Sequence, residues 1–317
     1  MTHAWNQTIE IDEQKASQLI ESQHPILISK ISLLDSGWDN QVFLVNETMI
    51  FRFPRREFGL DCMENEIALL PYIANQVSFP LSAPQWIGQP SDLYPHPFAG
   101  YSIIPGKAVS DVSPSLITNI TFATTLATWL SELHAIPVTN HYAQLIKGEQ
   151  GWRYDVNHRV SRCKENLERY ENHFIQLGFD KNSLLEVIAK LPTLTFQENK
   201  KSYLHADLYS RHVVMNPETG APTGLIDWGD THIGHPGIDL AVGMIFTEEA
   251  FQRFISAYGH VDNDMMNLSL LHAFCHHMSF LPYTCEQNKP HLMRWAAMVL
   301  ARTIDEISKR VRKEQTK

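Results

Sequence analysis

One feature constrains the fold of this chain more than any other: three short β-like segments interrupt a stretch whose pattern is otherwise helical. The segments cover residues 202–205, 212–215 and 224–227. They are rich in apolar and β-branched residues, and Pro217 and Gly220 mark a turn between the second and the third. This order predicts a loop between the first two segments and a hairpin between the last two.

Polar residues are concentrated at the ends of these segments. Asp207 follows the first segment, His212 begins the second, and Asp227 ends the third. The predicted loop and hairpin bring the three side chains together. The set suits phosphoryl transfer, because that reaction needs a carboxylate near the attacking hydroxyl and ligands that hold Mg²⁺ against nucleotide phosphates.

The chain divides into two zones at a Pro-Gly turn. Before Pro105, four apolar and aromatic segments are predicted strands: residues 41–45, 49–53, 83–88 and 100–104. Met63, Ile67 and Leu70 recur at helical spacing between them, and Pro71 is expected to kink or restart that helix. After the turn, long amphipathic stretches predict helices over residues 122–133, 150–190 and 248–312.

Composition limits the class of protein. At 317 residues with 44% hydrophobic and 19% charged content, the chain can bury a core and form two packed units with a cleft between them. Its formal charge of −9 provides no basic field, so neither nucleic acid nor a membrane surface is an expected partner.

The cysteines and the N-terminus favour a cytoplasmic protein. Four cysteines are widely spaced in a chain that needs no disulfide bonds for stability, so reduced thiols are expected. The first residues are polar and lead into acidic ones, without the basic start and apolar run of an export signal.

Residues 205–229 resemble the catalytic loop and the metal-binding Asp of the aminoglycoside and macrolide phosphotransferases, which are relatives of the protein kinases. The kinase pattern His-x-Asp-x-x-x-x-Asn ends in Asn, whereas this chain has His212 there. That substitution is typical of the macrolide 2′-phosphotransferases.

The resemblance extends in order over roughly residues 30–240. Gly37-Trp-Asp-Asn-Gln-Val-Phe43 is similar to the nucleotide loop of that family. Ile50-Phe-Arg52 is similar to its phosphate-contacting strand, with Arg in the position that is usually Lys, and Glu64-Asn-Glu66 is similar to the helix that carries the ion-pair Glu.

The resemblance implies an α+β, protein-kinase-like two-lobed fold, with a small antiparallel-sheet N-lobe and a mostly helical C-lobe. The N-lobe, residues 1–104, is expected to hold five strands and one helix and to bind the nucleotide. The C-lobe, residues 105–317, is expected to carry the catalytic and acceptor-binding groups, with a linker at about 102–107.

The same resemblance implies the roles of individual residues. Asp207 orients or deprotonates the acceptor hydroxyl, while His212 and Asp227 hold Mg²⁺. A bulky Tyr101 at the back of the nucleotide site disfavours adenine, which favours GTP as the phosphate donor, with ATP as the alternative. The expected nucleotide-binding residues are Ser36, Gly37, Arg52, Glu66, Tyr101, Ile103 and Ile104.

The leading hypothesis is a monomeric kinase that phosphorylates a small-molecule antibiotic, a macrolide, at the 2′-hydroxyl of its amino sugar and so confers resistance. The alternatives are an aminoglycoside phosphotransferase, a kinase of a small metabolite, and a non-catalytic pseudokinase or nucleotide-binding module. A zinc protein is a weaker alternative, because the spacing of His272, Cys275, His276, His277 and Cys285 matches no zinc pattern.

Three further residues near the site are interpreted conservatively. His205 is expected to be structural, and Asp239 is expected to brace the catalytic loop. Asp230 could contact a second metal ion, but a surface turn explains it equally well.

Overall fold

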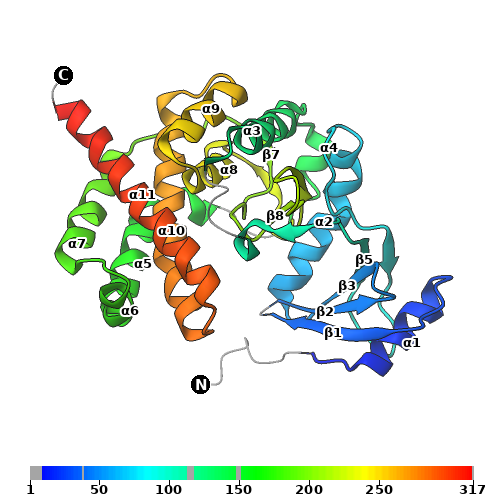
Figure 1. The fold of residues 1–317 in the computed structure, drawn as a ribbon. Helices are drawn as coiled ribbons and strands as arrows, with labels where there is room; N and C mark the ends of the chain where they lie inside the picture. The colour runs from blue at the N-terminus through cyan, green and yellow to red at the C-terminus, as the bar shows by residue number, and fades with distance from the viewer. Residues whose placement is uncertain (1–8, 38, 113–117, 148–150, 316–317) are drawn as a thin grey trace.

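The structure is a computed structural model that describes residues 9–37, 39–112, 118–147 and 151–315. A small sheet with two helices packs against a larger helical part (Figure 1). The N-terminal elements are α1 (Glu13–Gln23), β1 (Ile31–Ser36), β2 (Asn40–Val45), β3 (Met49–Pro54), α2 (Glu57–Ala74), β4 (Trp86–Gly88) and β5 (Phe98–Ser102).

The elements that follow begin at Lys107. They are β6 (Lys107–Ala108), η2 (Val109–Asp111), α3 (Ile120–Ala135), α4 (Asn140–Ala143), η4 (Gly151–Arg153), α5 (Val156–Arg169), α6 (Glu171–Gln176), α7 (Lys181–Lys190), η5 (Leu191–Thr193), β7 (Ser202–Leu204), β8 (Val213–Met215), β9 (Pro222–Leu225), β10 (His232–Gly234), α8 (Gly237–Leu240), η6 (Ala241–Ile245), α9 (Glu248–Tyr258), α10 (Asn263–Glu286) and α11 (Pro290–Gln315).

The N-terminal sheet is antiparallel, with strand order β1-β2-β3-β5-β4. The predicted hairpin of β2 and β3 is confirmed. Its turn places Asn46 and Glu47 at φ 49° and 60°, the left-handed conformation that a short hairpin loop needs. Buried aromatic rings fill one face of the sheet, and Phe53 stacks on Phe98 at 4.6 Å between centroids.

The prediction of one helix in this lobe is wrong, because α1 is a second. Asp12 caps its N-terminus by accepting a hydrogen bond from the Lys15 amide at 2.7 Å. Only Ala16, Leu19 and Ile20 are buried, so the helix lacks the wide apolar stripe that reveals a helix in a sequence.

Of the two effects predicted for Pro71, a kink or a restart, the restart is wrong, since α2 continues through Pro71 to Ala74. Pro71 lies in the last turn of the helix, so few helical hydrogen bonds remain beyond it. Leu69, Leu70 and Ile73 are fully buried in the core, and their burial offsets the cost of about 3 kcal/mol that an internal proline carries.

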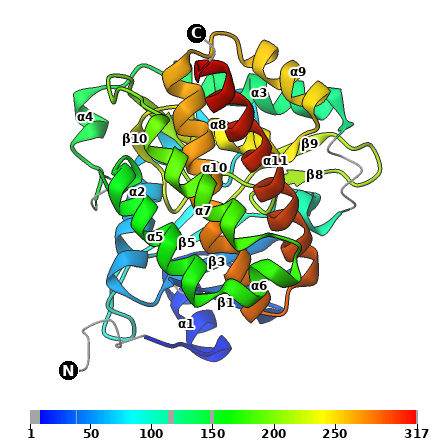
Figure 2. The same ribbon diagram turned by 90° about the vertical axis from the view of Figure 1, so that its left-hand side faces the viewer.

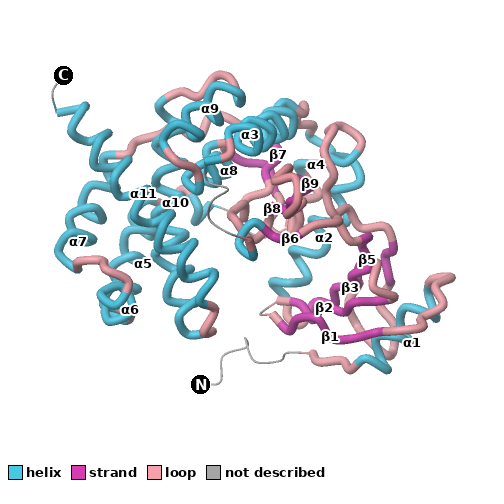
Figure 3. The backbone as a smooth tube through the Cα atoms, viewed as in Figure 1, coloured by secondary structure: helices cyan, strands magenta, loops and turns pink. Residues whose placement is uncertain are grey.

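The three central segments form strands as predicted, in two small sheets. β7 pairs with β10, while β8 pairs with both β6 and β9. Figure 3 shows these strands between the N-terminal sheet and the large helices. The connection into them needs Gly106, because its φ is 138° and a Cβ there would lie 2.4 Å from the carbonyl oxygen of Met215.

The helices of the larger part pack around this central segment. α10 lies against α5, α8 and α11, and α3 lies against α9; Figure 2 shows α5, α7, α10 and α11 on one side of the molecule. The helical stretches predicted after the Pro-Gly turn are therefore confirmed. No helix in the described part of the chain combines the length and apolar content that a membrane span requires.

Candidate active site

The loop after β7 and the end of β9 bring Asp207, His212 and Asp227 together. His212 lies between the two carboxylates, with Nδ1 3.5 Å from Asp207 Oδ2 and Nε2 3.3 Å from Asp227 Oδ2. All three line a cleft of about 430 Å³ whose opposite wall comes from the N-terminal sheet and α2. The juxtaposition predicted from the strand order is present.

A buried carboxylate holds the catalytic loop in an unusual backbone conformation. Ala206 has φ 67°, a left-handed conformation that is rare for residues other than glycine. Asp239, fully buried, accepts hydrogen bonds from the amides of His205 and Ala206 at 2.8 and 2.7 Å. His205 adds a contact of 2.9 Å from Nε2 to the carbonyl oxygen of Ile226. Asp239 and His205 therefore brace the loop.

The tautomer of His212 follows from its partners. Nδ1 lies 2.7 Å from the backbone carbonyl oxygen of Asp207, and since a carbonyl only accepts, Nδ1 must carry the proton. Burial lowers the pKa of His212, so in the neutral ring Nε2 presents a lone pair toward the Asp227 carboxylate. Two electron-pair donors facing one another suit a cation between them.

Arg52 joins the N-terminal lobe to Asp227. Its guanidinium contacts Glu66 Oε1 at 2.7 Å and Asp227 Oδ1 at 3.0 Å. Glu66 is fully buried and also accepts a hydrogen bond from the Tyr101 hydroxyl at 2.8 Å. Arg52 thus contacts two carboxylates at once, which the planar guanidinium does more readily than an ammonium.

The predicted nucleotide-binding residues do not all reach the cleft. Ser36, Gly37 and Arg52 line it, and the Gly37 carbonyl accepts a hydrogen bond from Arg55 at 2.8 Å. The other predicted residues are not among those that line it: Glu66, Tyr101, Ile103 and Ile104. Trp38, within the predicted nucleotide loop, lies outside the described residues.

The two carboxylates differ in their electrostatic surroundings. Burial, Asp230 and Asp227 raise the pKa of Asp207 to about 7, so this group can exchange a proton near neutral pH. Burial also acts to raise the pKa of Asp227, but Arg52 and His212 outweigh it and the pKa falls to about 2. Asp227 therefore stays ionised to lower pH than Asp207.

Sequence reasoning missed Arg153 and the pair Asp35–Arg211. Arg153 is buried; it donates to the Ala206 carbonyl at 3.1 Å and to Asp230 at 2.8 Å, so Asp230 belongs to a structural ion pair. Arg211 contacts Asp35 at 3.3 Å across the cleft. These contacts join residues far apart in sequence, so no local pattern reveals them.

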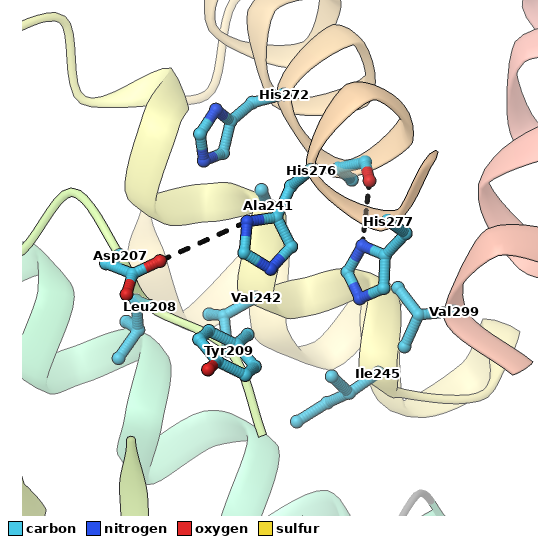
Figure 4. Close-up of a pocket in the computed structure, with 11 residues that line it drawn as sticks. Asp207, Leu208, Tyr209, Ala241, Val242, Ile245, His272, His276, His277 and Val299 are labelled. Atoms are coloured by element: carbon cyan, nitrogen blue, oxygen red, sulfur yellow. Dashed lines mark hydrogen bonds and ion pairs between the residues drawn. The ribbon is translucent and has the colours of Figure 1, made fainter. Parts of the chain in front are cut away.

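Of the three imidazoles that α10 contributes, His276 lies next to Asp207, as Figure 4 shows. His272, His276 and His277 line a second, small cavity that shares Asp207 with the large cleft. Among the described residues no group of three or more His, Cys, Asp or Glu side chains is placed to hold a metal ion. Mg²⁺ needs fewer protein ligands, because it keeps waters and binds substrate phosphates.

The fold has a sheet lobe and a helical lobe, with a loop that carries Asp207 between them. This combination defines the class of kinase-like phosphotransferases. A model of the phosphotransferase enzyme family matches residues 30–270, and the chain belongs to that family. No curated protein sequence matches the chain.

Several solved structures share the fold. The GDP complex of aminoglycoside 2′-phosphotransferase-IIIa is 22% identical, with 93% of this chain and 99% of that chain covered, at TM-score 0.67. Macrolide 2′-phosphotransferase type I is 18% identical, with 92% and 98% covered, at 0.58. Macrolide 2′-phosphotransferase MphH from Brachybacterium faecium is 16% identical, with 86% and 91% covered, at 0.55. The predicted two-lobed kinase-like fold is confirmed.

Proposed function

We propose that this protein transfers the γ-phosphate of GTP, with ATP as the alternative donor, to the 2′-hydroxyl on the amino sugar of a macrolide. The observation that carries this proposal is His212, which lies between a proton-accepting Asp207 and an ionised Asp227 at the edge of a cleft. Acting as a cytoplasmic monomer, the protein would inactivate the antibiotic.

Each residue has a role in the transfer. Asp207 accepts the proton of the acceptor hydroxyl, whose oxygen bonds to the γ-phosphorus while the bond from that phosphorus to the nucleoside diphosphate breaks. Arg52, held by Glu66, presents positive charge to the nucleotide phosphates. His212 and Asp227 would hold Mg²⁺, which neutralises phosphate charge when bound.

The part of the cleft that α10 and the turn after it contribute favours a macrolide over an aminoglycoside. Five carboxylates line the rest of the cleft, those of Asp35, Asp39, Asp207, Asp227 and Asp230. The end of α10 and the turn after it contribute Tyr283, Gln287 and Lys289 to the cleft, without a carboxylate. A polycationic aminoglycoside calls for an acidic site, whereas a large lactone with one amine needs apolar area and a single anion. The preference for GTP stays a prediction from the bulk of Tyr101, whose ring is buried and does not line the cleft.

The test is a transfer assay over erythromycin-like macrolides, kanamycin-like aminoglycosides and choline, with GTP and ATP in parallel and Mg²⁺ present. The expected result is a mass gain of one phosphate on macrolides alone. A gain on aminoglycosides alone or choline alone would replace the proposed acceptor. Nucleotide binding without a gain on any acceptor would indicate an unlisted metabolite or a pseudokinase, and metal analysis of the purified protein would test the zinc alternative.

A further inference from the structure

The helix that carries Glu66 is bonded to the larger helical part of the molecule as well as to the N-terminal sheet. Asn65, directly before Glu66 in α2, is 2% exposed. Its side-chain Nδ2 donates a hydrogen bond to the carbonyl oxygen of Lys147 at 3.1 Å, and its Oδ1 accepts one from the amide of Lys147 at 2.6 Å. Asn65 therefore exchanges two hydrogen bonds with the backbone of a residue 82 positions later in the chain.

A contact between two tyrosine rings joins α2 to the same region of the helical part. Tyr72 of α2 stacks on Tyr142 of α4, at 4.2 Å between ring centroids and an interplanar angle of 24°. Asn65 and Tyr72 are two helical turns apart, so they lie on one face of α2, about 10 Å apart along its axis. Two contacts at this separation, both off the helix axis, hold α2 against tilt and rotation.

The placement of Glu66 depends on these contacts of α2. Its carboxylate contacts Arg52 of β3 at 2.7 Å and accepts a hydrogen bond from Tyr101 of β5 at 2.8 Å. Arg52 in turn contacts Asp227 at 3.0 Å. Neighbouring residues of a helix are fixed relative to one another, so a rotation of α2 that breaks the hydrogen bonds of Asn65 also moves Glu66 away from Arg52.

We propose that Asn65, supported by Tyr72, is a positioning residue for Glu66. By keeping α2 in place, it holds Glu66 where its carboxylate directs Arg52 toward the nucleotide phosphates. A buried amide suits this task, because its hydrogen bonds are directional and are stronger away from water. The proposal rests on the function proposed above, which assigns Arg52 to those phosphates.

The test is calorimetric titration of the full chain with GTP and with ATP. Asn65→Leu keeps the size of the side chain but removes both hydrogen bonds, so the Kd of the nucleotide that the wild type binds more tightly is expected to rise about fivefold. Lys147→Ala is the matched control, because it keeps the backbone groups that Asn65 meets and removes only an ion pair of 3.3 Å with the partly exposed Glu64. Its Kd should stay within about twofold of the wild type. An unchanged Kd in Asn65→Leu, an equal rise in Lys147→Ala, or a wild type that binds neither nucleotide would overturn the proposal.

A double-variant cycle separates positioning from a general loss of structure. In the Glu66→Gln background, Asn65→Leu is expected to raise the Kd by less than about twofold, because Asn65 acts through Glu66. The same rise in both backgrounds would show that Asn65 acts independently of Glu66 and would contradict the proposal. Thermal melts check that each variant folds.

Tyr72 provides a second test that does not depend on the folding of Asn65→Leu. Tyr72→Leu removes the ring stack and is expected to raise the Kd about twofold, whereas Tyr72→Phe keeps the stack and should leave the Kd unchanged. Equal Kd values for these two variants would contradict the anchoring of α2. Because binding requires no turnover, a Kd that depends on Asn65 without transfer to macrolides would refute only the proposed function.

Discussion

The two sides of the cleft are built from different chemistry. On the N-terminal side, Arg52, Glu66 and Tyr101 are joined to one another and to Asp227 by contacts of 2.7 to 3.0 Å. On the α10 side, ring side chains predominate, and His276 approaches Asp207 no closer than 4.0 Å. The charged side is held in one arrangement by these ion pairs and hydrogen bonds, while the aromatic side lacks such pairing.

The largest predicted effect is a loss of turnover at Asp207 without a loss of nucleotide affinity on the charged side. Asp207→Asn removes the proton acceptor, and kcat for the acceptor is expected to fall by about 10³-fold. Nucleotide affinity should stay within about twofold, as measured by titration with GTP. The surface variant Asp305→Asn is the control, and a variant Asp207→Asn that retains full turnover would exclude Asp207 as the base.

The next effect concerns the loop that both sides share. Asp239→Asn exchanges a buried acceptor for an amide group that faces the His205 and Ala206 amides, so the free energy of unfolding should fall by about 3 kcal/mol. Urea denaturation at pH 7 measures this, with Asp305→Asn expected to change it by less than about 0.5 kcal/mol.

The difference in unfolding free energy between wild type and Asp239→Asn should change with pH in one direction. Burial acts to raise the pKa of Asp239, but the hydrogen bond from His134 and its charge lower it overall. The carboxylate therefore stabilises the native state above the unfolded pKa of about 3.9, and this contribution is lost as the pH falls through the native pKa. The gap between wild type and Asp239→Asn should narrow on acidification; a constant gap would contradict this role.

A smaller effect tests the charged side alone. Arg52→Lys cannot reproduce both guanidinium contacts, so KM for the nucleotide is expected to rise about tenfold, with KM for the acceptor unchanged. The double variant with Arg52→Lys and Glu66→Gln should raise the nucleotide KM by a smaller free-energy increment than the two single variants in sum, because the residues form one network. Strict additivity would show that they act independently.

The smallest effect concerns the pair that crosses the cleft. Asp35 and Arg211 are 47% and 36% exposed, so Asp35→Asn should change nucleotide affinity by less than about 1 kcal/mol. The change should shrink further in high salt, because exposed charges are screened. Affinity titrations at low and high ionic strength measure this; an effect that is large and independent of salt would place Asp35 in direct contact with the nucleotide.

Sequence patterns predicted the features that are determined by residues close together in the chain. The β2–β3 hairpin, the three central strands and the meeting of Asp207 with His212 and Asp227 follow from turn residues and strand order. The helix α1 escaped prediction because it buries only three side chains.

The remaining features of the site depend on contacts between distant parts of the chain. Arg153 reaches Asp230 across 77 positions, and no spacing rule reveals such a pair. The rings of Tyr209, His276 and Phe280 come together only when α10 packs beside the loop after β7, so spacing in the sequence does not reveal their contacts. Tertiary packing decides both features.

The central claim is that Asp207 receives one hydroxyl of a macrolide, the 2′-hydroxyl of its amino sugar. The most direct measurement is the position of the phosphate on a macrolide incubated with the protein, GTP and Mg²⁺, mapped by phosphorus–proton NMR correlation. The account predicts a single phosphate, on the 2′-hydroxyl of the amino sugar. A phosphate on any other hydroxyl, or none on any macrolide, would contradict it.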